Sequence, residues 1–147
     1  MARRHGFTLI ETLIVLVVIG LVGLIALPKL NDAFAQSNLL SAKAKVMALY
    51  SAARATAVST NQTAILRVNG NQVYVYARPR RKAGVGTVDT IIKPTNLSTA
   101  YGVALSGGVD SVRVSPTGLG LDSAAIILTK SSHVDTVFIS RFGRVIK

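Results

Sequence analysis

A single carboxylate lies near the start of a long apolar stretch, in a position where an acidic side chain is unexpected. Glu11 lies near the beginning of Gly6–Pro28, GFTLIETLIVLVVIGLVGLIALP, and no charged residue follows it between Thr12 and Pro28. An acidic side chain inside a membrane helix costs about 2.5–3.5 kcal/mol on insertion scales. In low dielectric, pairing with a positive group offsets much of that cost. We therefore expect Glu11 to have a function that involves its charge.

The stretch that carries Glu11 is long enough to cross a membrane. A helix rises about 1.5 Å per residue and the hydrocarbon core is about 30 Å thick, so about 20 apolar residues span it. Phe7 to Pro28 provides 22 positions. Arg3 and Arg4 precede the span and no comparable basic cluster follows closely. The positive-inside rule then predicts a cytoplasmic N-terminus, with everything after Pro28 on the far side of the membrane.

Three interpretations of this segment compete. A cleaved secretory signal is suggested by Ala33-Phe34-Ala35 before Gln36, which has the small-residue form of a signal peptidase site. Against it, Lys29 and Asp32 intervene and the uncharged run exceeds the usual apolar region of a signal. A plain anchor helix explains the length but not Glu11.

The third interpretation rests on a family resemblance. The hexapeptide Gly6–Glu11, GFTLIE, followed by the apolar run, resembles the class III signal of type IV pilins and pseudopilins. The resemblance implies that a prepilin peptidase cuts between Gly6 and Phe7 and that the new N-terminal Phe7 is N-methylated. It also implies that Glu11 is the family's acidic residue, which pairs with the terminal amine of a neighbouring subunit in an assembling filament.

The overall charge indicates an acidic partner. Without residues 1–6 the chain carries 15 Lys and Arg against 6 Asp and Glu, a net charge of +9. Nucleic acid, anionic lipid and acidic protein surfaces all fit such a balance, although excess charge also simply keeps a domain soluble.

Few residues are available for catalysis. Cys is absent, which excludes disulfides, thiolate nucleophiles and thiolate metal sites. Beyond the leader the single histidine is His133, and Asp135 follows at a spacing typical of a solvated pair rather than a catalytic triad. Gly84-Val85-Gly86 lacks the strand-to-helix context of a phosphate loop, and the acidic residues are scattered. We expect no enzyme activity, no cofactor and no metal site.

After Pro28, which should kink or loosen the helix, an apolar face recurs at spacings of three and four and predicts an amphipathic helix to about Ser59. Its members are Leu39, Ala42, Val46, Leu49, Tyr50, Ala53 and Ala57. The alanines favour helix and let a sheet approach closely.

From Thr63 the period changes to two, and Asn69-Gly70 is a strong hairpin signal. The predicted strands are 63–68, 72–78, 87–93 (stopped by Pro94), 101–105, 111–114, 124–129, 134–140 and 144–147, with a loop at 95–101 and a turn at Ser115–Gly118. The predicted fold class is α+β: a long N-terminal helix packed on an antiparallel β-sheet head, pilin-like. The expected parts are a leader (1–6), a transmembrane half-helix (7–28), an amphipathic half-helix (29–60) and a β-rich head (61–147).

The tail narrows the resemblance. Thr136–Lys147, with Ser115–Gly118 ahead of a strand, resembles the C-terminal half of the GspH/FimT family of minor pilins and pseudopilins, in which a final hairpin closes on a Gly-Arg turn, here Gly143-Arg144. One branch of that family binds DNA during uptake through a Gly-Arg-x-Arg tail. This chain has Ile146 in place of the second Arg, followed by Lys147.

We therefore expect a non-enzymatic minor pilin or pseudopilin of a type II secretion pseudopilus or type IV pilus. The alternatives are a DNA-binding minor pilin and a major pilin. The implied partners are the prepilin peptidase, other pilins or pseudopilins and an inner-membrane assembly platform. The implied location is the inner membrane, single-pass with a periplasmic head, and later the filament. The candidate anion- or DNA-binding residues are Arg78, Arg80, Arg81, Lys82, Arg141, Arg144 and Lys147.

Overall fold

A computed structural model gives the fold and describes residues 8–77, 89–107 and 110–146. The chain divides into two compact units, Met1–Phe34 and Ala35–Lys147. The first contains the beginning of helix α1 (Leu9–Thr60). The described residues of the second form the rest of that helix, eight strands and a short helix. The architecture is α+β, as the sequence predicts.

The second half of α1 buries the face that the sequence predicts. Its buried residues are Ala35, Leu39, Ala42, Val46, Leu49, Tyr50, Ala53 and Ala57. The helix then ends at Thr60, where Asn61 adopts φ 52° and the N–H of Gln62 donates to the carbonyl of Ala57 at 3.1 Å. A left-handed Asn after the last turn is a common helix terminus, which explains the predicted end at this point.

Four strands form the first sheet, in the order β3-β2-β1-β5 and antiparallel throughout. They are β1 (Ala64–Asn69), β2 (Gln72–Ala77), β3 (Asp89–Asn96) and β5 (Ser111–Val114). The hairpin predicted at Asn69-Gly70 is confirmed, because Asn69 pairs with Gln72 across a two-residue turn. Gly70 has φ 55° there, a conformation that favours glycine.

Two predictions for the segment around Pro94 are wrong. Strand β3 does not stop before Pro94 but continues to Asn96. It is an edge strand with shifts of register opposite β2, and such a position tolerates a residue without an N–H. The predicted loop at 95–101 is largely helix α2 (Leu97–Tyr101), because the Asn96 side chain accepts N–H groups from Ser98 and Thr99 at 3.0 and 3.2 Å.

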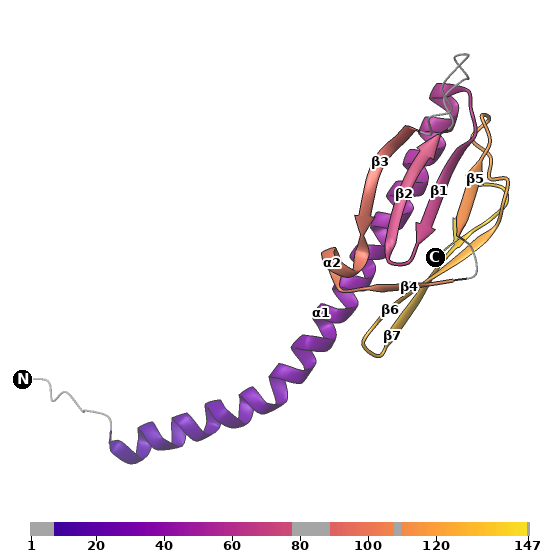
Figure 1. The fold of residues 1–147 in the computed structure, drawn as a ribbon. Helices are drawn as coiled ribbons and strands as arrows, with labels where there is room; N and C mark the ends of the chain where they lie inside the picture. The colour runs from indigo at the N-terminus through magenta and orange to yellow at the C-terminus, as the bar shows by residue number, and fades with distance from the viewer. Residues whose placement is uncertain (1–7, 78–88, 108–109, 147) are drawn as a thin grey trace, which may run out of the picture. The chain divides into compact units, whose positions relative to one another are not determined.

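A second antiparallel sheet has the order β4-β6-β7-β8. Its strands are β4 (Ala104–Ser106), β6 (Ala124–Lys130), β7 (His133–Ile139) and β8 (Val145–Ile146). The strand predicted at 101–105 therefore starts later than expected, since Tyr101 ends α2. Figure 1 shows β1, β2 and β3 alongside the C-terminal half of α1, with β6 and β7 forming a separate ribbon beside them.

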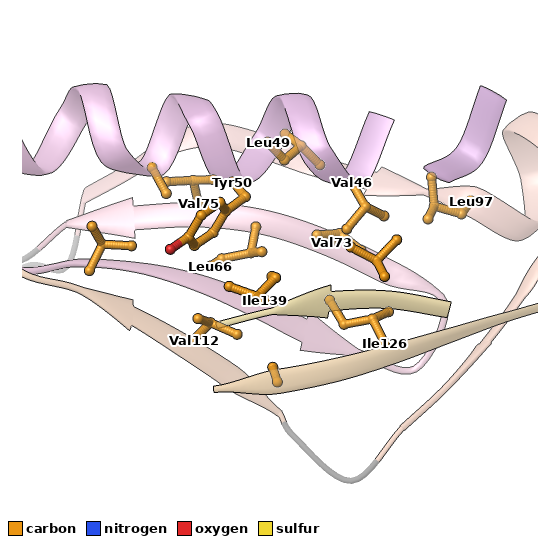
Figure 2. Packing of buried hydrophobic residues seen from close by; sticks show 14 of the residues in the cluster. Val46, Leu49, Tyr50, Leu66, Val73, Val75, Leu97, Val112, Ile126 and Ile139 are labelled. Atoms are coloured by element: carbon orange, nitrogen blue, oxygen red, sulfur yellow. The ribbon is translucent and has the colours of Figure 1, made fainter. Parts of the chain in front are cut away.

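One core joins the helix to both sheets. Val46, Leu49 and Tyr50 of α1 face the strands in Figure 2, with Leu66 and Val75 below them. The same cluster contains side chains of the second sheet, Ile126, Leu128, Val137 and Ile139 among them. Within the described ranges no polar or charged residue is classed as buried. The head is thus held together by apolar packing between one helix face and two sheets.

Candidate functional site

The start of α1 positions Glu11. Thr8 precedes the helix, and its hydroxyl accepts the N–H of Glu11 at 3.3 Å. Glu11 therefore occupies the third position of the first turn, in the Thr-x-x-Glu order of a capping box. A carboxylate there also favours the positive end of the helix dipole. Glu11 is exposed, so local structure orients it while leaving its carboxylate available to another molecule.

After Glu11, the part of α1 that belongs to the first unit exposes apolar side chains along its whole length. Large hydrophobic residues from Leu9 to Phe34 are exposed, among them Leu9 (82%), Leu16 (69%) and Leu24 (73%). The stretch is long and apolar enough to cross a membrane, and nothing in its most apolar eighteen-residue window is buried. Such a surface is stable only in lipid or against other apolar helices.

The two processing residues of the resemblance, Gly6 and Phe7, lie outside the described residues. The first described residue, Thr8, leads directly into the helix at Leu9. The Gly6–Phe7 cleavage site remains a prediction.

The other predicted site lies in the turn between β7 and β8. The N–H of Ser140 donates to the carbonyl of Arg144 at 2.8 Å, and the N–H of Gly143 donates to the carbonyl of Ser140 at 2.9 Å. Gly143 has φ 74°, so a side chain there would be strained. The closing hairpin with a Gly-Arg turn is therefore present, and it exposes Arg141 and Arg144 on one short segment.

Arg54, on α1, ties this turn to the helix. Its Nε donates to the carbonyl of Gly118 at 2.9 Å and one of its terminal nitrogens donates to the carbonyl of Gly143 at 3.3 Å. The buried Tyr50 hydroxyl lies against the same region, since a Cβ on Gly120 would stand 3.2 Å from it. Arg54 lies outside the predicted apolar face of the helix, and nothing in the sequence pattern reveals its carbonyl partners 64 and 89 residues away.

Asp122 partly offsets the positive charge of the arginines around this turn. The Arg113 side chain donates two hydrogen bonds to Asp122, from Nε to Oδ2 at 2.8 Å and from a terminal nitrogen to Oδ1 at 2.9 Å, and its backbone N–H donates a third to Oδ2 at 3.2 Å. These hydrogen bonds, with a smaller contribution from the charge of Arg141, lower the pKa of Asp122. Arg141 is therefore close enough to interact electrostatically with Asp122, which is already paired with Arg113.

Among the candidate basic residues, Arg78, Arg80, Arg81, Lys82 and Lys147 lie outside the described residues. The structure therefore brings together Arg141 and Arg144. It does not test whether the loop from Arg78 to Lys82 joins them.

Of the pair His133 and Asp135, the carboxylate of Asp135 is bound by Lys43. Both carboxylate oxygens of Asp135 accept the Lys43 ammonium at 2.7 Å, which links β7 to α1. That hydrogen bond is the main reason why the pKa of Asp135 is lowered. Among the described residues, no cluster of three His, Cys, Asp or Glu residues could hold a metal ion.

Comparison with known families and structures adds two findings. The family described as "Prokaryotic N-terminal methylation motif" matches residues 1–27. The chain is also similar in fold to the type IV minor pilin FimU of Pseudomonas aeruginosa strain PAO1, in two crystal forms. The first gives a TM-score of 0.57 at 15% identity over 76% of this chain and 88% of FimU. The second gives 0.53 at 14% identity over 73% and 90%. No curated protein sequence matches the chain significantly.

Proposed function

We propose that this chain is a minor pilin or pseudopilin of the GspH/FimT type, because the N-terminal methylation motif matches residues 1–27 and the fold is similar to that of FimU. In this role it is a non-enzymatic subunit that enters a type IV pilus or a type II secretion pseudopilus through its N-terminal helix. A minor pilin of the type IV pilus, FimU, shares its fold at low sequence identity, which supports a pilus but leaves a secretion pseudopilus open.

The observation that carries the proposal is the exposed apolar start of α1. From Leu9 to Leu27 the helix offers Leu, Ile and Val side chains that no described part of the chain covers. Before assembly, lipid would cover them, with residues 1–6 cytoplasmic and the head periplasmic. After assembly, the helices of neighbouring subunits would replace the lipid.

Glu11 sets the position of an incoming subunit relative to its neighbours in the filament. Once cleavage after Gly6 frees the amine of Phe7, the carboxylate of an incoming subunit can pair with the amine of a neighbour already in the filament. An unpaired carboxylate in low dielectric is expensive, so each subunit is most stable where its charge is neutralised. The capping contact with Thr8 keeps Glu11 at the helix start, where such an amine would lie.

The partners that follow from this role are a prepilin peptidase, an inner-membrane assembly platform and other pilins. Non-enzymatic function is supported by the engagement of Asp135 with Lys43, which gives the candidate His133–Asp135 pair a packing role instead. The tail that resembles GspH/FimT favours a minor over a major subunit. Quantifying subunits in sheared filaments tests this, since a major subunit would dominate them.

Intact mass and N-terminal peptide analysis of the membrane-extracted and filament-bound protein test the proposal. We expect a chain that begins with N-methylated Phe7 in both fractions. An N-terminus at Met1 or Ala2 would contradict processing. An N-terminus at Gln36 would instead establish a cleaved secretory signal.

A second candidate function, DNA binding, is favoured by one specific feature of the β7–β8 turn. Phe142 is 79% exposed and stands between the exposed Arg141 and Arg144. An aromatic ring for base stacking between two cations for phosphates is a common combination in proteins that bind single-stranded nucleic acid. We propose this activity as an addition to the pilin role.

Gel shifts at rising salt, with single- and double-stranded DNA and the detergent-solubilised full chain, test this candidate. We expect weaker binding for Arg144→Ala and Phe142→Ala, and little change for Arg67→Ala, an exposed arginine on β1. No shift at low salt, or equal losses in all three variants, would contradict a site at this turn.

A further inference from the structure

Among the described residues, no charged side chain lies on the outer face of the second sheet. On β6 the side chains alternate between buried and partly exposed, and the register carries this alternation to the neighbouring strands. Nine positions thus share the face turned away from the core: Ala104, Ser106, Ala125, Ile127, Thr129, Val134, Thr136, Phe138 and Ile146. We call this surface the neutral face.

Large apolar groups on the neutral face are open to solvent. Val134 is 64% exposed, Ile146 is 52% exposed and Phe138 is 42% exposed. Phe138 and Ile146 are direct cross-strand partners, and Phe138 also pairs with Ala125. These side chains form a continuous apolar row across three strands. Contiguous exposed apolar surface usually marks an interaction site, whereas single exposed apolar residues are ordinary.

The rest of the head has a different character. Residues 35–147 contain fourteen Lys and Arg against four Asp and Glu, a net charge of +10. The outer face of the first sheet follows that trend, with Arg67 and Arg113 exposed beside the tyrosine pair Tyr74 and Tyr76. A charge-free face on so basic a head resembles the charge-depleted centre of a protein–protein interface.

One border of the neutral face is an unfilled strand edge. Strand β8 pairs with Phe138 and Ile139 of β7. Within the described ranges, no strand pairs with His133–Thr136 on that side of β7. An open edge offers backbone N–H and C=O groups to an extended segment of another protein.

We propose that the neutral face is the docking surface for the head of a different subunit of the same filament, one that presents an uncharged, apolar surface. This inference rests on the proposed function. A nucleic acid or an anionic lipid surface has nothing to pair with on this face. A second copy of this chain would bring together two heads that each carry +10, which disfavours self-association.

Cysteine labelling provides a clean experiment because the chain contains no Cys. Single variants Val134→Cys and, as a second position, Thr136→Cys report the neutral face. Arg67→Cys, on the outer face of the first sheet, is the matched control. A maleimide-polyethylene glycol probe is reacted with each variant in sheared filaments and in detergent-extracted protein. Unchanged thermal unfolding of the detergent-extracted variants shows that they fold.

We expect the two neutral-face cysteines to react about tenfold more slowly in filaments than in detergent, because an interface excludes the probe. The Arg67→Cys control should react at similar rates in both. Equal reactivity of all three variants in filaments would overturn the docking surface while leaving the pilin function intact. Absence of the chain from filaments would overturn both proposals.

The choice of partner is tested with a benzophenone maleimide attached at Val134→Cys and activated by light in filaments. We expect a cross-linked product that contains this chain and a different pilin subunit by mass spectrometry. A product of two copies of this chain, or none despite protection from the maleimide probe, would overturn the proposed partner.

Discussion

The two halves of helix α1 share one backbone conformation but differ in the exposure of their apolar side chains. In the first unit the side chains are mainly Leu, Ile and Val, and they are exposed from Leu9 onward. In the second unit the inward positions are buried, and half of them are alanine; the others are Leu39, Val46, Leu49 and Tyr50. One half therefore depends on a partner outside the chain, whereas the other half already has its partner in the sheets.

The choice of side chain explains this difference. Bulky apolar residues all around a helix suit lipid or a bundle of helices. Alanines on one face instead let a sheet pack closely without large cavities. The first half has a surface that suits lipid or other apolar helices, and the second half is the structural base of the head.

Matched leucine truncations test this contrast with the largest effect. Leu49→Ala removes a side chain that is 3% exposed, and Leu16→Ala removes one that is 69% exposed. We expect Leu49→Ala to lower the free energy of unfolding of the head by about 2–5 kcal/mol. Leu16→Ala should change it by less than about 0.5 kcal/mol. Chemical denaturation of the full chain in detergent measures both.

Equal losses in the two leucine variants would contradict the contrast. They would mean that the first half of α1 contributes to the stability of the head.

The Lys43–Asp135 pair sharpens the comparison, because it fixes the second half of α1 to β7 through a partly buried contact. Replacing Asp135 by Asn should cost about 1–3 kcal/mol at pH 7. The folded-state pKa of Asp135 is lowered, so the contribution is present above the unfolded value of about 3.9 and is lost as pH falls through the folded-state pKa.

Denaturation of the wild type and Asp135→Asn between pH 7 and pH 3 measures this prediction. The difference between the two proteins should shrink on acidification. A constant difference would show that Asp135 acts through packing alone. The exposed Arg113–Asp122 pair provides a control in which Asp122→Asn should have a smaller effect at pH 7.

A smaller effect is expected for Arg54→Ala. The change removes the hydrogen bonds to the carbonyls of Gly118 and Gly143 and should destabilise the head by about 1 kcal/mol. It should also speed amide hydrogen exchange in the β7–β8 turn. Unchanged exchange at Gly143 would show that α1 does not hold this turn.

The strongest sequence signals predicted the structure well, for physical reasons. The seven-residue face from Leu39 to Ala57 is buried as predicted, because a period of 3.6 residues specifies one side of a helix. Strand β5 matches its predicted bounds, and the turn at Asn69-Gly70 fixes the β1–β2 hairpin. These signals are local, so the sequence alone carries them.

Features that depend on distant contacts could not be predicted in the same way. Pro94 is tolerated because β3 lies at a sheet edge, and strand order is not a local property. Helix α2 is too short for a periodic signal, and a capping Asn96 alone does not predict a helix. The division into two sheets and the carbonyl partners of Arg54 likewise depend on tertiary pairing.

We propose that the charge of Glu11 controls assembly through the start of α1, and the variant Glu11→Gln tests this proposal. A capping box accepts Gln as well as Glu, so this variant removes the charge while keeping the local role beside Thr8. The measurement is the fraction of processed protein recovered in sheared filaments, with N-terminal mass analysis of both fractions. We predict normal cleavage before Phe7 and strongly reduced incorporation. Incorporation equal to that of the wild type would contradict charge neutralisation as the basis of assembly.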